Sequence, residues 1–189
     1  KLKREFKTKE DRWWRTGEYD EETYESHLDS LVLFYQDEGY LDIEVVHDSV
    51  RFAGNKEDIF IDIEISEGPK YYVGDFYFTG NKVLESDSLK EKIAMRKGKP
   101  FAKSKFDMTR YLVEDAYREE GYLWVRVTDE RSYRGDTIDV TFDIAEGRAA
   151  VVRKVVVTGN QKTMEKVVRR EIRTIPGQKY RQSKMTRSV

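Results

Sequence analysis

The chain has 189 residues, of which 38% are charged and 13% are aromatic, a composition typical of a globular protein. Lysine and arginine number 35 against 36 aspartate and glutamate, and the net charge of −1 gives no general attraction to nucleic acid or anionic lipid. There is no cysteine, which excludes disulfides and thiolate metal sites. No apolar run approaches the roughly 18 residues of a membrane-spanning helix and no secretory signal is visible, so we expect any targeting or membrane part to lie outside these residues.

The N-terminal part of the chain, up to Gly68, predicts two helical segments, separated at Gly17, followed by two strands. Residues 1–16 fit a helix, and residues 19–38 predict an amphipathic one, because apolar side chains recur at helical spacing: Tyr24, Leu28, Leu31 and Tyr35. Strands are expected over 40–50 and 59–65, with a turn at 53–56. The second strand alternates isoleucine with mostly polar residues, as a strand buried on one side does.

The next residues predict the order β-α-α-β-β. A strand over 71–79 ends in a turn at Gly80, and a short helix over 86–95 follows, with Ser86 or Ser88 as its N-cap. A second helix over 104–119 places Phe106, Val113 and Tyr117 on one face. Strands over 122–133 and 138–145 complete the series, joined by a turn at 134–136. The last strand alternates strictly, which favours a central position in the sheet.

The remaining residues begin the same order again, with a strand over 151–158, a helix over 163–174 and the first residues of a second helix. We therefore divide the chain into a partial unit over 1–68, a complete unit over 69–147 and a partial unit over 148–189. The fold class is α+β: tandem β-α-α-β-β modules, each a three-stranded sheet covered on one face by two helices.

A sequence repeat supports this division. Thr79-Gly80-Asn81, Glu67-Gly68 and Ser104-Lys105 recur at one constant spacing as Thr158-Gly159-Asn160, Glu146-Gly147 and Ser183-Lys184. Glu38-Gly39-Tyr40-Leu41 recurs at a slightly longer spacing as Glu120-Gly121-Tyr122-Leu123, so one hairpin differs in length between the two copies. Surface hairpins tolerate such insertions, and repeated motifs in one order indicate a structural repeat.

The sequence shows no arrangement typical of catalysis. The two histidines, His27 and His47, lack metal-ligand spacing, and no phosphate-binding glycine loop is present. The abundant carboxylates follow alternating strands and helix surfaces, where they are normally solvated. We therefore predict a protein that is not an enzyme and has no metal or cofactor.

The order of elements and the repeated Gly-Tyr, Glu-Gly and Gly-Asn pairs resemble POTRA domains, the polypeptide-transport-associated repeats of the Omp85 superfamily. The resemblance covers essentially the whole chain. The third unit resembles the last domain before the barrel, through its opening helix, Pro176-Gly177 and Tyr180. It implies part of the third, all of the fourth and the start of the fifth of five domains.

The resemblance also implies a function. The chain would be the periplasmic scaffold of an outer-membrane β-barrel assembly factor, linked to a β-barrel outside these residues. Its partners would be unfolded outer-membrane proteins and periplasmic accessory lipoproteins, and not nucleic acid. By the same resemblance the corner formed by Arg169, Arg170 and Glu171 would dock such a lipoprotein, with helix surface charge as the alternative interpretation.

The residues themselves suggest where an unfolded client would bind. If the closing strand is central, the strand before it lies at an edge, and its unpaired backbone groups can accept an extended peptide. The predicted edge carries Arg126 and no proline, and an ordinary protected edge is the alternative. The hinges between units are predicted at Gly68, Pro69 and Gly147. The predicted client edge is Tyr122, Leu123, Trp124, Val125, Arg126, Val127 and Thr128.

Two other functions remain open at this point. POTRA domains also occur in two-partner secretion transporters, organelle import channels and division proteins, and the sequence of a following barrel would distinguish these systems. KH RNA-binding domains share the β-α-α-β order, but they need a Gly-x-x-Gly loop. The predicted helix–helix loops at Gly98 and Gly177 lack the second glycine.

Overall fold

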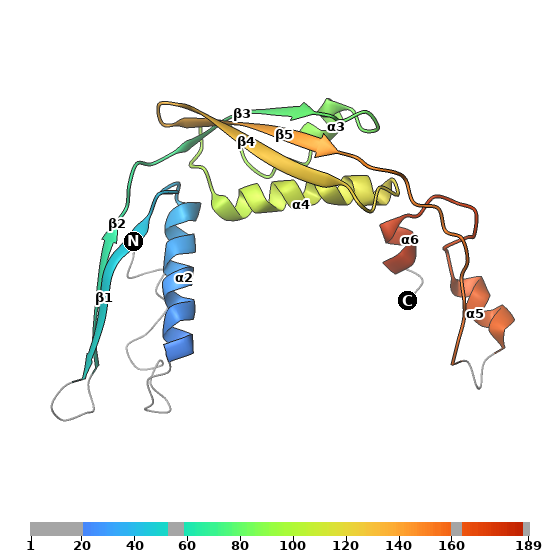
Figure 1. Ribbon diagram of the computed structural model, residues 1–189, viewed down its shortest axis with the longest axis horizontal. Coiled ribbons are helices and arrows are strands. Elements are labelled where there is room, and N and C mark those ends of the chain that lie inside the picture. Colours follow the sequence, from blue (N-terminus) through green and yellow to red (C-terminus); the bar gives the residue numbers. More distant parts are fainter. Residues whose placement is uncertain (1–20, 53–58, 160–163, 187–189) are drawn as a thin grey trace.

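The computed structural model describes residues 21–52, 59–159 and 164–186. These residues form an arch, with the middle unit at the top, α2 and the β1–β2 hairpin descending on one side, and α5 and α6 on the other (Figure 1). The helix expected over 1–16 and the turn expected over 53–56 lie outside the described residues.

The middle unit has the predicted order and topology. It consists of β3 (Tyr72–Thr79), α3 (Ser86–Lys90), α4 (Lys103–Glu119), β4 (Arg126–Arg134) and β5 (Thr137–Ala145). The sheet order is β3-β5-β4, so β5 is central as its alternation predicted; β3 runs parallel to it and β4 antiparallel. α4 runs along one face of the sheet (Figure 1), and Leu89 of α3 is buried in the same core as Phe106 and Val113 of α4.

The core of the middle unit lies between that sheet face and α4. Alternate β5 residues are buried, among them Val140 and Phe142, both fully. The ring of Phe142 has three aromatic neighbours: Phe76, Phe78 and Phe106, with centroids 6.1, 5.7 and 5.8 Å away. The buried positions of α4 are Phe106, Thr109, Val113 and Tyr117, which is the face predicted from helical spacing. Burial of this apolar surface is the main stabilising term of the unit.

The first unit contains α2 (Glu21–Asp37), β1 (Glu44–Phe52) and β2 (Ile59–Ser66). Its described core is small and consists of Leu31, Tyr35 and Ile43. Among the described residues, β2 pairs only with β1, whereas the matching strand β5 lies between two strands. The isoleucines of β2 are accordingly only half-buried or exposed, and Ile63 has 37% of its surface accessible.

The third unit differs from the prediction. It contains α5 (Glu165–Glu171) and α6 (Gln182–Thr186), but residues 151–158 do not form a strand. The described part of this segment makes one isolated bridge, between Val151 and Lys179. The physical reason is the lack of a partner, because the matching strand β3 is held by β5, and the described residues of the third unit include no counterpart of β5.

Two further predictions in the middle unit were wrong in their boundaries. The first helix ends at Lys90 and not at 95, and its N-cap is Glu85, which makes no side-chain cap bond. Ser86 instead accepts a hydrogen bond from the Asn81 side chain at 3.1 Å. The β4 strand begins at Arg126 and not at Tyr122.

Candidate functional site

The middle sheet has two edge strands, β3 and β4, and β4 is the edge predicted to bind a client. Within the part of the chain that the structure describes, β4 pairs only with β5, in one register from Arg126 opposite Ala145 to Arg134 opposite Thr137. In an antiparallel strand every second residue directs both its N–H and its C=O to the same side. Alternate residues of β4 therefore present unpaired backbone groups away from the sheet, as an edge strand does.

Only the last three of the seven predicted edge residues belong to β4. The first four form the turn after α4, in which the Val125 N–H donates to the Tyr122 carbonyl at 3.2 Å and the Tyr122 N–H to the Tyr117 carbonyl at 2.9 Å. Because these N–H groups bond within the turn, they are not available to an incoming strand. The turn contains Tyr122, Leu123, Trp124 and Val125, and the strand begins with Arg126, Val127 and Thr128.

The side chains of this segment alternate between buried and exposed from Trp124 to Thr128. Val125 and Val127 are buried against the helices, whereas Trp124, Arg126 and Thr128 are exposed. Trp124 has 70% of its surface accessible, an unusual exposure for so large an apolar side chain. The start of the edge therefore has an apolar inner side and an exposed aromatic ring beside it.

The second half of β4 carries charged side chains on its inner side, and the sequence pattern did not predict them. Arg131 lies over the ring of Phe106, 4.6 Å from its centroid, and its Nε donates to the Asp129 carboxylate at 3.1 Å. Arg110 of α4 lies 3.8 Å from Asp129. Inward-pointing charges are one way in which edge strands avoid unwanted pairing. The edge is therefore more strongly protected from Asp129 onwards than at Arg126–Thr128.

The two junctions between units share one arrangement. At the first, the Asp37 carboxylate at the end of α2 accepts hydrogen bonds from Ser104, from its N–H at 2.7 Å and its hydroxyl at 2.5 Å. At the second, Glu119 at the end of α4 accepts bonds from the N–H and hydroxyl of Ser183, at 2.5 and 2.8 Å. The N-cap residue of α4 is Ala102, which has no side-chain acceptor. The preceding unit thus supplies the acceptor that an N-cap normally provides.

The backbone repeats the same contacts at both junctions. The Tyr71 N–H donates to the Gly39 carbonyl at 2.8 Å, and the Ala150 N–H donates to the Gly121 carbonyl at 2.7 Å. Gly39 has a φ of 102°, and a Cβ there would lie 2.8 Å from the Tyr71 carbonyl oxygen. A larger residue would meet both the steric cost of positive φ and a clash with the next unit. The glycine of each repeated Gly-Tyr pair therefore contacts the next unit.

The first junction has additional side-chain contacts. The Tyr71 hydroxyl donates to the Asp42 carboxylate at 2.7 Å, which raises the pKa of Tyr71, and the Lys70 ammonium lies 5.0 Å from the centre of the Tyr40 ring. In the repeat register, Trp124 and Ala150 stand where Asp42 and Tyr71 do, so the second junction lacks this hydrogen bond.

The predicted hinge residues lie beside these contacts. Gly68 and Gly147 both have positive φ, 66° and 71°. A Cβ on Gly68 would lie 3.1 Å from that of Asp42, and one on Gly147 would lie 3.6 Å from the Trp124 carbonyl oxygen. Pro69 is exposed.

The Thr-Gly-Asn and Glu-Gly motifs meet inside the middle unit. The Glu146 carboxylate accepts hydrogen bonds from the N–H groups of Lys82 and Val83, at 2.6 and 2.8 Å. Gly80 has a φ of 74°, and a Cβ there would lie 2.3 Å from the Ile144 carbonyl oxygen. In this unit the Thr-Gly-Asn motif forms the turn, and the glutamate of the Glu-Gly motif supplies the carboxylate that binds the backbone after it.

The same carboxylate lies beside a buried tyrosine. The Tyr117 side chain is fully buried, and its hydroxyl has no hydrogen-bond partner at bonding distance among the described residues. Burial, followed by the negative charge of Glu146, raises the pKa of Tyr117 well above its usual value. Tyr35 and Glu67 occupy the equivalent positions in the first unit, and burial and Glu67 likewise raise the pKa of Tyr35.

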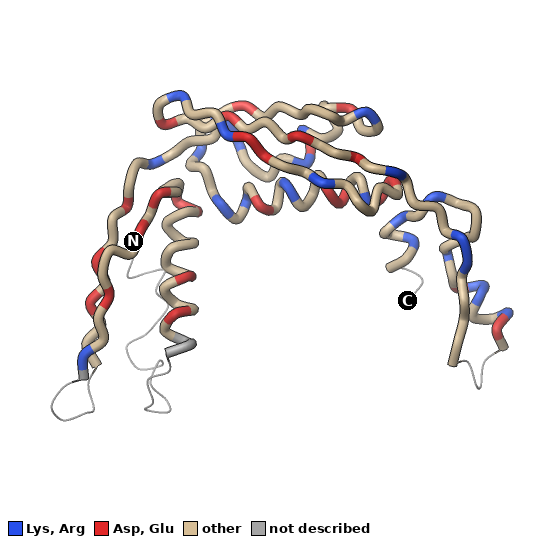
Figure 2. Tube along the Cα trace, viewed as in Figure 1, with Lys and Arg blue, Asp and Glu red and all other residues tan. Residues whose placement is uncertain are grey.

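The predicted docking residues Arg169, Arg170 and Glu171 all lie on the surface of α5, a helix with no buried residue. Arg169 pairs with Glu165 at 2.7 Å, and Arg170 lies 3.8 Å from Glu171. Such exposed pairs contribute little to stability. Basic residues predominate along the third unit (Figure 2), so Glu171 is a negative charge in basic surroundings.

Neither a metal-ligand cluster nor a membrane-spanning helix is found among the described residues. No group of three or more His, Cys, Asp or Glu side chains there is placed to hold a metal ion. None of the helices described has the length and apolar character needed to cross a membrane.

Comparison with known families identifies the repeat. The model of the POTRA family, described as a surface antigen variable number repeat, matches residues 1–68, 71–147 and 150–189. The chain therefore belongs to the POTRA family, whose α+β modules the fold reproduces.

Among individual proteins, the chain is similar to outer membrane protein assembly factor BamA of Neisseria meningitidis. The identity is 26% over 196 residues, which cover 100% of this chain and 24% of that protein. A putative outer membrane protein assembly factor of Treponema pallidum is 24% identical over 194 residues, covering 100% of this chain and 23% of its own length. The chain thus spans about a quarter of the length of these relatives.

Solved structures agree on the fold. The crystal structure of POTRA domains 3 to 5 of Haemophilus influenzae BamA matches with a TM-score of 0.71 and 21% identity, over 90% of this chain and 68% of that one. BamA of Haemophilus ducreyi lacking POTRA domains 1 to 3 matches with a TM-score of 0.56 and 17% identity, over 71% of this chain and 24% of that one. The first match, like this chain, contains consecutive POTRA domains.

Proposed function

We propose that the chain belongs to the periplasmic arm of an outer-membrane β-barrel assembly factor, and that the start of β4 binds unfolded outer-membrane proteins by strand addition. The observation that carries the proposal is the unpaired edge at Arg126–Thr128, where the inner side is apolar. Strand addition uses main-chain hydrogen bonds, so it accepts many sequences, as a general assembly factor requires. The similarity to outer membrane protein assembly factors supports the same function.

The geometry limits the length of the bound segment. The residues before Arg126 form a turn, and the inward charges begin at Asp129. A client strand would therefore pair with only a few residues, beside the exposed ring of Trp124. Short pairing gives weak binding, because only a few main-chain hydrogen bonds are available to offset the freedom lost on association. Such binding suits the transient handling of a client that must be released to the barrel.

The test is a titration of the isotope-labelled chain with an eight-residue peptide that alternates valine and threonine, followed by amide chemical shifts. The proposal expects shifts along Arg126–Thr128. Amide exchange in the free protein identifies which alternate residues have N–H groups facing solvent, and a proline at such a position removes the donor while leaving the β5 bonds intact. This variant should melt normally and lose binding. Shifts confined to α3 and α4 would contradict strand addition.

The second part of the proposal concerns accessory lipoproteins, which would dock on α5 at Arg169, Arg170 and Glu171. The support is the exposure of all three side chains and the negative charge of Glu171 in a mostly basic unit. In the protein that carries this chain, Glu171→Lys should weaken lipoprotein capture without changing the melting temperature. Glu64→Lys, an equally exposed change on β2, is the matched control. Equal capture by both variants would leave α5 as a solvated surface.

A further inference from the structure

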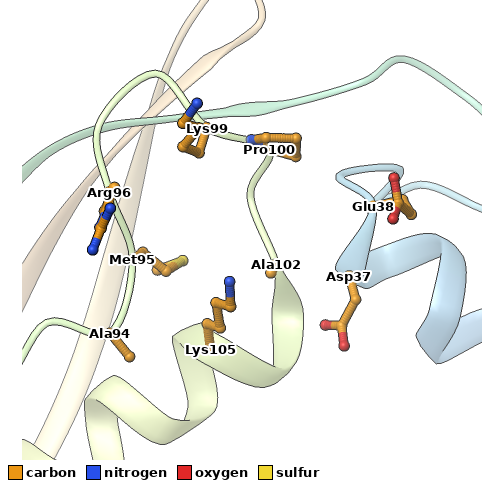
Figure 3. Close-up of a pocket in the computed structure, with 9 residues that line it drawn as sticks. All are labelled: Asp37, Glu38, Ala94, Met95, Arg96, Lys99, Pro100, Ala102 and Lys105. Atoms are coloured by element: carbon orange, nitrogen blue, oxygen red, sulfur yellow. The ribbon is translucent and has the colours of Figure 1, made fainter.

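The first junction contains a cleft that the proposed function does not use. Its volume is about 520 Å³. It lies between the end of α2, the start of α4 and the loop that joins α3 to α4 (Figure 3). The lining residues are Asp37, Glu38, Ala94, Met95, Arg96, Lys99, Pro100, Ala102 and Lys105.

Three cations in this cleft have no anionic partner within the described part of the chain: Arg96, Lys99 and Lys105. By contrast, two other lysines of the same segment do have anionic partners. Lys97 binds both oxygens of the Asp75 carboxylate, at 2.6 and 2.7 Å, and Lys103 pairs with Asp107. The same segment thus neutralises the cations that do not line the cleft and leaves unpaired those that do.

The carboxylates of the cleft do not balance this charge. Asp37 is already bound to the N–H and hydroxyl of Ser104 at the start of α4. Glu38 is exposed and is the one other acidic residue in the lining. The cleft therefore has three cations against two carboxylates, one of which already accepts two hydrogen bonds from Ser104. Anionic groups should accumulate there.

The rest of the lining is apolar and small. Met95 and Ala102 line the cleft but are each only 7% exposed, and Figure 3 shows the Lys105 side chain extending from α4 towards the loop that carries Met95. Pro100 and Ala94 complete the apolar surface. An apolar ligand group seated on Met95 would be surrounded by the three cations, and an unbranched thioether adapts readily to different shapes.

The equivalent position at the second junction has a different lining. In the repeat register, Arg173, Lys179 and Arg181 replace Ala94, Pro100 and Ala102. Lys184, equivalent to Lys105, donates a hydrogen bond to the Gln178 side chain at 3.3 Å. Long charged side chains thus replace small apolar ones, so the apolar floor belongs to the first junction.

We propose that this cleft is a docking site for an acidic segment of a partner protein, with carboxylates on Arg96, Lys99 and Lys105 and one apolar side chain on Met95. The volume falls within the range of about 300–1,000 Å³ typical of ligand sites and suits a few residues of extended peptide. The proposal goes beyond the proposed function, because the site is formed by two units together and does not include the β4 edge.

The test uses the full chain and a fluorescein-labelled peptide Glu-Asp-Leu-Glu-Asp, with binding followed by fluorescence anisotropy. Lys99→Gln and Lys105→Gln should each weaken binding about twofold to fivefold, the effect of one exposed ion pair, and the double variant should weaken it further. Ala94→Trp, at an exposed position on the cleft wall, should abolish binding by filling the space. The amide-form peptide Gln-Asn-Leu-Gln-Asn should not bind.

Lys97→Gln and Lys103→Gln are the matched controls, because they remove the same charge from the same segment but do not line the cleft. The proposal expects both to bind the acidic peptide as the unmodified chain does. Equal weakening by the control and cleft variants would overturn it, as would equal binding of the neutral peptide or no binding of the acidic one. Anionic lipid vesicles that bind through the same two lysines, while the acidic peptide does not bind, would overturn it in favour of a membrane surface.

Discussion

The Asp37 carboxylate at the end of α2 accepts two hydrogen bonds from Ser104, 67 residues later, and so caps a helix of the next unit. The relation recurs between Glu119 and Ser183, 64 residues apart. Because α4 has no side-chain cap of its own, the stability of this helix depends on the position of the preceding unit. The angle between units and the start of the next long helix are thus coupled through one carboxylate.

Asp37→Ala should loosen the first junction and cost about 1 kcal/mol of unfolding free energy, the usual effect of losing an N-cap acceptor. The sequence contains no cysteine, so two cysteines introduced at the exposed positions Glu25 and Lys92 can carry spin labels. Pulsed electron resonance should show a broader distance distribution between them. Asp29→Ala, on the exposed side of the same helix, should leave the distribution unchanged. An equally narrow distribution for Asp37→Ala would show that the capping bond does not fix the angle.

Gly39→Ala should destabilise the chain more than Gly135→Ala. Both glycines have positive φ, 102° and 63°, and each substitution costs about 1–2 kcal/mol for that reason. Only the Cβ at Gly39 also meets another unit, 2.8 Å from the Tyr71 carbonyl oxygen, whereas the space around Gly135 is open. Urea unfolding measures the difference. Equal losses would mean that the close approach between units is relieved by a small shift.

Glu146→Ala should reduce the unfolding free energy by about 2 kcal/mol, since two backbone N–H groups lose a charged acceptor. The exposed Glu130 on β4 provides the control, and Glu130→Ala should stay within about 0.5 kcal/mol of the unmodified chain. Amide exchange at Lys82 and Val83 should accelerate in the first variant only. Unchanged exchange at these two positions would contradict the assigned role of the carboxylate.

Tyr117→Phe should make the chain less sensitive to alkaline pH. The folded pKa of Tyr117 is raised, so the folded state keeps the proton when the unfolded chain loses it at a pKa of about 10. This contribution to stability is fully present below pH 10 and is lost as the pH rises from there towards the folded pKa, at about 1.4 kcal/mol per pH unit. The difference in unfolding free energy between pH 9 and pH 11 should be smaller in the variant than in the unmodified chain. Tyr111→Phe, an exposed ring on the same helix, should show no such reduction.

The β4 strand illustrates what could be read from the sequence and what could not. Its edge position followed from the strict alternation of β5, because a strand buried along one whole face is most easily accommodated between two others. Its starting point did not follow, since Tyr122 and Leu123 have strand-like composition and yet form a turn. The turn exists because Gly121, which follows α4, has positive φ and the Tyr122 N–H after it bonds back to the Tyr117 carbonyl of the helix.

By itself the sequence determined the module, its order of elements and its repetition, because these depend on local periodicity and on glycines with a required backbone conformation. Only the tertiary structure decided what these motifs contact in the next unit: Gly39 lies against Tyr71, and Asp37 caps the helix that contains Ser104. It also showed that, among the described residues, three cations of one cleft have no anionic partner. It also decided that residues 151–158 form no strand, although their composition predicts one. The reason in each case is that a hydrogen bond or an ion pair needs a partner in space, and the distance along the chain to that partner is not encoded in either residue alone.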